Sequence, residues 1–266
     1  MTIEKNMEEI EEKKKHLLDV KNEKRVIKKY IENLEEKMEN SGTDDSSADE
    51  SEENPSSQED AEELNELRGR LQQLNENKDL LLNECKNVLL NLMREIVESK
   101  NSTRNANGKS DEEMLNRMWE CFIAAILKQQ DDLDDIIHVG AANDKGLADI
   151  LVGKQADERE FGKFAVNCVV QVKTTKQFSV GNPSVASASI LQLIGSCVYH
   201  GTRKGALYSS ERKSSLMEII QDLLETLHAQ DYTIQCFFRE DIESLLPKDP
   251  DDVDTFLVNF RDYLHN

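Results

Sequence analysis

Two neighbouring stretches of sequence decide the fold: GAANDKGLADILV at residues 140–152 and NCVVQVKTTK at residues 167–176. In the first, the carboxylate of Asp149 stands inside an apolar run of the kind that forms a strand. In the second, Gln171 and Lys173 are two residues apart, so on a strand they share a face. A charged residue rarely occupies a central strand unless it is paired or binds a metal. We therefore expect these three polar side chains to form a site.

The segments around these stretches predict a sheet covered by helices. A hairpin between strands at residues 147–152 and 164–175 would bring Asp149 to the Gln-x-Lys pair. A helix opened by Ser110 precedes them, and the later pattern predicts an alternation of helices and strands. The expected order is α-β-β-β-α-β-α-β-α, a mixed α/β fold. Outside the strands already given, the predicted elements are a strand at 135–139, a helix at 184–199, a strand at 205–209, a helix at 214–229, a strand at 233–238, a helix at 241–246 and a last helix from Pro250, with Asp249 as its N-cap.

The three residues suit metal-assisted hydrolysis of a phosphodiester. Magnesium prefers oxygen ligands and keeps several waters, so one carboxylate with carbonyl oxygens is a sufficient protein contribution. Asp149 is the expected main ligand, with the side-chain oxygen of Gln171 and the backbone carbonyl of Val172 beside it. Lys173 is expected to orient the attacking water or to stabilise the transition state. The expected cofactor is Mg²⁺ or Mn²⁺.

The same residues carry a family resemblance. Glu120 in WECFIAAIL, Gly146 and Asp149 in NDKGLADI, and Gln171 and Lys173 in VVQVKTTK resemble the Mrr-type (type IV) restriction endonucleases, a branch of the PD-(D/E)xK nucleases with Gln in place of the acid. The likeness covers about 135 residues, half of the chain. It implies a restriction-endonuclease-like sheet, metal-dependent cleavage of DNA, and a catalytic part for Glu120.

One departure from that family concerns the turn before Asp149. The family usually reads Asp-Gly-Gly-x-Asp, whereas this chain reads Asp-Lys-Gly-Leu-Ala-Asp from Asp144 to Asp149, one residue longer. The role of Asp144 is therefore open, while Asp149, Gln171 and Lys173 are all present.

The amino-terminal part predicts a coiled coil interrupted by a linker. Residues 1–40 and 61–99 read as helices with apolar heptad stripes, whereas residues 41–60 are acidic and Ser-rich and are expected to be disordered. The two helices could fold back on each other or pair with a second chain. A hinge at 100–109 would then lead into a nuclease-like domain at 110–266. The seam positions are Leu17, Val20, Ile27, Ile31, Leu34 and Met38 in the first run, and Leu64, Leu67, Leu71, Leu74, Leu81, Cys85, Val88 and Leu92 in the second, with Lys24 and Lys78 as polar interruptions.

The composition restricts the functions that can be predicted. The chain has a formal net charge of −20, divided as −9 over residues 1–110 and −11 over residues 111–266, so neither part is broadly basic. A nucleic-acid enzyme would need a local basic patch, because phosphate neutralisation drives non-specific binding. The five scattered cysteines and the absence of a secretory leader or a long apolar run predict a soluble, intracellular protein, cytoplasmic or nuclear, with no membrane partner.

Two functions remain in view. The first is a metal-dependent nuclease that hydrolyses phosphodiester bonds, with DNA the expected substrate, and that self-associates or binds a partner helix through residues 1–99. The second is an inactive or weak nuclease-fold module that acts as a coiled-coil scaffold or a DNA-associated interaction protein. The intact Asp149, Gln171 and Lys173 set favours the nuclease, and the acidic charge favours the scaffold.

Overall fold

The computed structural model describes residues 2–41, 55–98, 111–129, 135–138, 148–155, 164–174, 183–211 and 217–265. Most of the expected linker, the expected hinge, Asp144 and Gly146 lie outside these residues. The chain divides into two compact units. One comprises Glu8–Asn87, and the other comprises Met1–Met7 together with Val88–Asn266.

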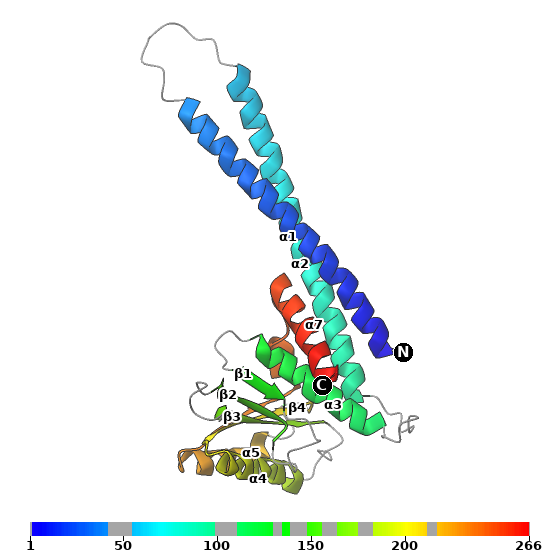
Figure 1. Cartoon of the computed structure of the whole chain (residues 1–266), viewed down its shortest axis with the longest axis vertical. Coiled ribbons are helices and arrows are strands. Elements are labelled where there is room, and N and C mark those ends of the chain that lie inside the picture. The colour runs from blue at the N-terminus through cyan, green and yellow to red at the C-terminus, as the bar shows by residue number, and fades with distance from the viewer. Residues whose placement is uncertain are drawn as a thin grey trace. The chain divides into compact units, whose positions relative to one another are not determined.

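The unit Glu8–Asn87 is a pair of helices that fold back on each other within one chain. Helix α1 (Thr2–Ser41) and helix α2 (Pro55–Glu98) run antiparallel (Figure 1). Lys13 Nζ lies 2.7 Å from Glu84 Oε2, and Lys37 Nζ lies 2.8 Å from Asp60, so the start of one helix meets the end of the other. Of the two pairings open at the level of sequence, the chain makes the intramolecular one.

Apolar seam residues hold this hairpin together. Ile27, Ile31 and Leu64 form its buried cluster, and partly buried Met38, Leu67, Leu71 and Leu74 pack against them. The expected linker is shorter than its composition suggested: α2 begins at Pro55, so residues 55–60 are helical. Proline suits the first turn of a helix, and Asp60 gains an ion pair with Lys37.

The other unit is built on a mixed five-stranded sheet in the order β1-β2-β3-β4-β5. Strands β1 (Asp135–His138), β2 (Ile150–Gln155) and β3 (Phe164–Lys173) pair antiparallel. Strands β4 (Lys204–Ser209) and β5 (Thr233–Phe237) continue from β3 in parallel. The β2–β3 hairpin and the expected succession of elements are confirmed. The carboxyl ends of β3, β4 and β5 consequently meet at one edge of the sheet.

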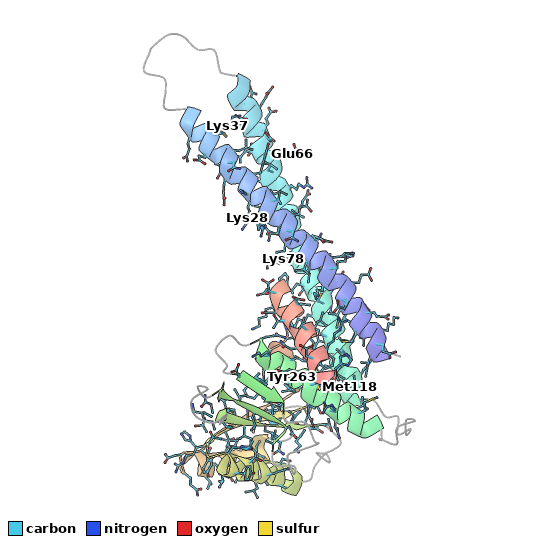
Figure 2. The ribbon with its side chains drawn as sticks, viewed as in Figure 1. Lys28, Lys37, Glu66, Lys78, Met118 and Tyr263 are labelled. Carbon is cyan, nitrogen blue, oxygen red and sulfur yellow. The ribbon has the colours of Figure 1, made fainter. Side chains whose placement is uncertain are left out.

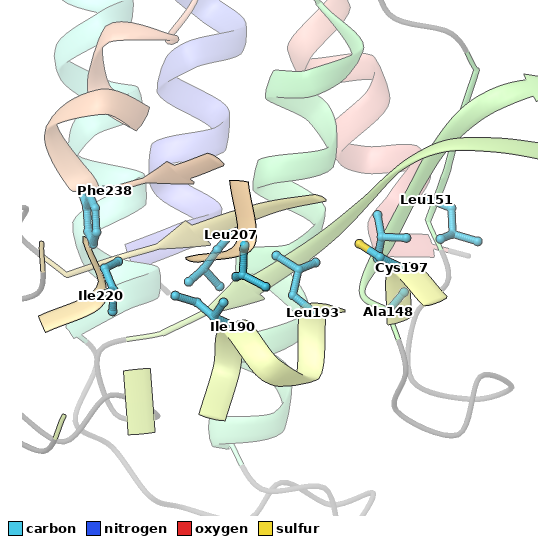
Figure 3. Packing of buried hydrophobic residues seen from close by; sticks show 10 residues of the cluster. Ala148, Leu151, Ile190, Leu193, Cys197, Leu207, Ile220 and Phe238 are labelled. Atoms are coloured by element: carbon cyan, nitrogen blue, oxygen red, sulfur yellow. The ribbon is translucent and has the colours of Figure 1, made fainter. Parts of the chain in front are cut away.

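Helices cover both faces of this sheet (Figure 1). Helices α4 (Pro183–Tyr199) and α5 (Met217–His228) lie on one face, and α3 (Asp111–Lys128) with α7 (Pro250–His265) lies on the other. The short α6 (Arg239–Ser244) follows β5. Figure 3 shows the core under α4 and α5, which includes Val169, Ile190, Leu193, Cys197, Leu207, Ile220 and Phe238.

Helices α3 and α7 form a second packed layer. Phe122 of α3 stacks edge-on against Phe256 of α7, with ring centroids 5.2 Å apart. Cys121 Sγ donates to the carbonyl of Tyr263 at 3.3 Å, and Figure 2 labels Tyr263 beside Met118 of α3. Asp249 is the N-cap of α7, as expected, because its Oδ1 accepts the backbone N–H of Asp251 at 2.8 Å. Within the described residues no helix combines the length and the apolar character needed to span a bilayer.

Candidate active site at the carboxyl end of β3

Asp149 stands at a bend immediately before β2, and not inside the strand as its apolar surroundings suggested. Its carboxylate Oδ2 accepts the backbone N–H of Val172 at 2.7 Å, and its own N–H donates to the carbonyl of Val170 at 3.2 Å. Both bonds tie Asp149 to β3. The bend has a physical reason, because the side chain takes the place of a backbone acceptor in the ladder and a regular strand would direct it elsewhere.

Gln171 lies across from this bend. Ile150 pairs with Val170, so the antiparallel register continued by one position places Asp149 opposite Gln171. The Gln171 side chain is 1% exposed, and within the described part of the chain its Oε1 has no hydrogen-bond partner. A buried amide oxygen without a partner costs about 1–3 kcal/mol. This oxygen can therefore accept a hydrogen bond or coordinate a cation.

Lys173 continues the same face of β3. Alternation from buried Val169 directs Gln171 and Lys173 toward the side of the sheet that α4 and α5 cover. Lys173 is partly exposed and pairs in register with Ser209 at the end of β4. The structure thus places Asp149, Gln171 and Lys173 at the same end of the β2–β3 hairpin. Gln171 is buried, and Asp149 and Lys173 are partly exposed.

The backbone of β3 adds one more oxygen. In an extended strand the N–H and C=O of one residue point to the same side. Since the N–H of Val172 points to Asp149, its carbonyl shares that side. The carbonyl of Lys173 points the other way, toward β4, where it accepts the N–H of Ser210 at 3.1 Å.

These oxygens fit a magnesium-type ion in character. A carboxylate, an unpartnered amide oxygen and a backbone carbonyl are all hard oxygen donors, and His or Cys is not among them. Among the described residues no group of three or more His, Cys, Asp or Glu side chains lies together, so a carboxylate-rich or zinc-type cluster is not what these residues offer.

Glu120 is the fourth residue of the predicted site, and its place is given by the helix that carries it. It lies on α3, which covers the other face of the sheet. Its neighbour Trp119 donates from Nε1 to the carbonyl of Lys173 at 3.2 Å, and Asn116 Oδ1 accepts from Thr174 Oγ1 at 3.1 Å. The turn of α3 that carries Glu120 therefore touches the end of β3 from the opposite side, and a part for Glu120 in the chemistry stays a prediction.

Trp119 and Asn116 are contributions that sequence reasoning did not single out. Trp119 is 1% exposed and fixes the backbone of Lys173 between α3 and β4, so the residue that follows Val172 has little freedom. Their spacing with Glu120, one helical turn from Asn116, was the available signal. Buried Thr174, Ser209 and Ser210 make the same edge polar.

Comparison with family models, with curated proteins and with solved structures found no match to this chain.

Proposed function

We propose that this chain is a metal-dependent nuclease of the restriction-endonuclease-like, Mrr-type class, with DNA as its substrate. The observation that carries the proposal is the meeting of Asp149 and Gln171 at the end of the β2–β3 hairpin. One carboxylate oxygen is bound by a backbone N–H, and a buried amide oxygen beside it has no partner in the described chain. The antiparallel hairpin followed by parallel strands supports the same fold class.

In this proposal Asp149, Gln171 Oε1 and the Val172 carbonyl would hold Mg²⁺ or Mn²⁺. A bound ion of this kind lowers the pKa of a coordinated water and neutralises charge that develops on the phosphate. The Val172 N–H orients the Asp149 carboxylate, because its hydrogen bond to Oδ2 fixes that oxygen against β3. Because Gln171 is buried, its amide is held in place and solvent water does not compete for the amide oxygen.

Lys173 acts on the phosphate side of the reaction. A water oxygen forms a bond to phosphorus, an ester P–O bond breaks, and the leaving oxygen takes a proton. The Lys173 ammonium, on the same face as Gln171, stabilises the additional negative charge of the transition state. Trp119 and Ser210 hold the Lys173 backbone, so the ammonium starts from a fixed point.

The test is cleavage of supercoiled and single-stranded DNA by the full-length protein with Mg²⁺ or Mn²⁺. Low ionic strength, about 50 mM salt, is appropriate because an acidic protein makes few phosphate contacts and loses binding as salt rises. Wild type is expected to nick and linearise DNA, and a chelator is expected to stop it. Asp149→Asn and Lys173→Met are expected to lose at least about 100-fold in rate, in line with the loss of a catalytic electrostatic group.

Matched controls are Asp222→Asn and Lys204→Met, which alter an exposed carboxylate on α5 and an exposed amine at the start of β4. Both should cleave at the wild-type rate. If wild type is as inert as Asp149→Asn on DNA and RNA alike, the nuclease proposal fails.

A second candidate is a scaffold in which the nuclease fold binds without cleaving. Two observations favour it: the net charge of −20 and a helical hairpin with exposed apolar side chains outside its seam. Val26 and Tyr30, one turn apart on α1, are 68% and 49% exposed and could receive a partner helix. Capture of a partner that Val26→Asp abolishes, by a protein without cleavage activity, would decide for the scaffold.

A further inference from the structure

Helix α4 differs from the other helices that the structure describes in having no charged residue. Its sequence, PSVASASILQLIGSCVY, contains no Asp, Glu, Lys or Arg over 17 residues, whereas about five would be expected at the chain's 32% average. Its inner face explains part of this, because Ile190, Leu193 and Cys197 belong to the core under the sheet (Figure 3). The outer face has no such reason to be uncharged.

That outer face is apolar and exposed. Leu191, Val198 and Tyr199 are 59%, 63% and 67% exposed. Ala188 and Gly195 are also exposed. Charge depletion with exposed aliphatic and aromatic side chains is the composition of an interface centre.

Gly195 is unexplained by the fold of one chain. A Cβ built at this position would meet nothing within 4 Å, so no neighbour in the chain requires glycine. Glycine is also among the poorest residues in a helix interior. Gly69 of α2 also has open space at its Cβ position, so glycine alone does not identify a contact. At Gly195 the missing side chain leaves room for close approach from outside on an exposed apolar face.

The order of small and large residues on this face is complementary to itself. Ala188, Leu191, Gly195 and Val198 follow one another at spacings of three, four and three, which places them on one stripe. If a second α4 lies antiparallel across a two-fold axis level with residue 193, Leu191 of each copy meets Gly195 of the other. Val198 of each copy likewise meets Ala188 of the other. An isologous contact requires this reciprocal matching.

Charge selects the same occupant. Each copy has a net charge of −20, and α4 has no charged residue, so two α4 helices can meet without like charges in direct contact. Nucleic acid is disfavoured because α4 offers no cation for phosphate. A membrane surface is disfavoured because an interfacial helix carries Lys and Arg on its polar side. We propose that α4 is the self-association surface of this chain, in an antiparallel two-fold contact centred on Leu191 and Gly195.

This contact is independent of the hairpin seam. The seam residues of α1 and α2 already pack on each other within one chain, so a dimer built through them would need the hairpin to open. The proposal is also independent of the nuclease activity, since it concerns association alone.

The test is sedimentation equilibrium of the full-length protein, with circular dichroism to establish folding. Wild type is expected to form a dimer. Gly195→Leu is expected to weaken it by roughly tenfold or more, the effect of losing one well-packed contact. At a protein concentration low enough for both proteins to be monomeric, the same change should preserve or raise the melting temperature, because leucine is the better helix former and has space in the single chain.

A double variant gives the sharper result. Leu191→Ala with Gly195→Leu exchanges the positions of the large and the small side chain on the stripe, and it is expected to restore most of the lost association. The matched control, Val258→Glu, alters a comparably exposed apolar residue of α7 and should leave the dimer unchanged. A wild type that stays monomeric, or a dimer indifferent to Gly195→Leu but abolished by Val26→Asp on α1, would overturn the proposal.

Discussion

At the scale of single residues, the site depends on where one polar atom has been left without a partner. Asp149, Val172 and Lys173 each have their backbone or side-chain bonds arranged by neighbours, whereas Gln171 Oε1 is buried with none in the described chain. A fold selected for stability alone would place an apolar side chain of similar size at position 171. Under the proposed function, a bound cation supplies the partner that this amide oxygen lacks.

This interpretation makes Gln171→Met a discriminating variant. Methionine has a similar length and no polar atom, so it removes the desolvation cost of the orphaned oxygen. We expect the free energy of unfolding to stay equal or rise by up to about 2 kcal/mol. Metal-dependent cleavage should fall, and the rise in melting temperature that we expect Mg²⁺ to cause in wild type should be lost. Urea unfolding and thermal melts with and without Mg²⁺ measure both.

The opposite outcome for Gln171→Met is equally informative. A clear loss of stability would show that the amide has a structural partner and that its burial is not evidence for a ligand site. Val172→Leu, a change of size without polarity on the same strand, controls for simple disturbance of packing.

At the scale of elements, the helical hairpin of α1 and α2 contains two lysines in its otherwise apolar seam. Lys24 and Lys78 are both partly buried, Figure 2 labels Lys78 in this region, and burial followed by the nearby Lys78 charge lowers the pKa of Lys24 from 10.5. Two like charges across a seam weaken it, but a polar seam position also fixes the register of paired helices.

Lys24→Leu is therefore expected to stabilise the hairpin, by about 1–2 kcal/mol, because it buries apolar surface and removes a disfavoured charge. Leucine and lysine have similar helix propensities, so the backbone contributes little. Lys29→Leu is the matched control, an exposed position on the same helix where we expect no change beyond about 0.5 kcal/mol. Urea unfolding followed by far-UV circular dichroism gives the comparison.

The pH dependence of that comparison has a definite sign. Since the folded-state pKa of Lys24 is below its unfolded value of 10.5, the unfolded chain binds more protons between the two. Wild-type stability therefore gains from this group as pH rises through that window. The advantage of Lys24→Leu should shrink toward alkaline pH, and a constant or growing advantage would show that the charge is not the cause.

The elements also show what sequence could and could not give. Periodicity predicted every strand from β1 to β5 and each helix that covers them, because a covered sheet imposes regular apolar spacing. It placed β2 at 147–152, whereas the strand is Ile150–Gln155, because Leu147 and Ala148 extend the apolar run toward the amino terminus. The tertiary bond from the Val172 N–H to the Asp149 carboxylate holds Asp149 at a bend before the strand begins. Heptads did not separate a hairpin from a dimer, because both bury the same stripe.

At the scale of the whole molecule, five free thiols are distributed over both compact units. Cys85 belongs to the helical hairpin, and Cys121, Cys168, Cys197 and Cys236 belong to the unit with the sheet. Burial raises the pKa of each thiol from 9.0, to about 11 for Cys85, Cys168 and Cys197 and to about 12 for Cys121 and Cys236. We therefore expect alkaline pH to lower the stability of both units through their buried thiols.

The alkaline response follows from proton linkage. Above pH 9.0 the unfolded chain releases thiol protons that the folded chain retains up to about 11 or 12, so the folded state binds more protons and stability falls as pH rises. Cys121 is fully buried, and its pKa is raised from 9.0 to about 12. At about 1.4 kcal/mol per pKa unit, this group alone contributes at most about 4 kcal/mol to the loss of stability.

Urea midpoints measured on both sides of pH 9.0 should decline only on the alkaline side. Cys121→Ala should flatten that decline for the unit with the sheet while leaving the hairpin's own decline, governed by Cys85, unchanged. A midpoint that stays level above pH 9.0, or one that Cys121→Ala leaves equally steep, would show that the buried thiols are not what limits this fold in alkali.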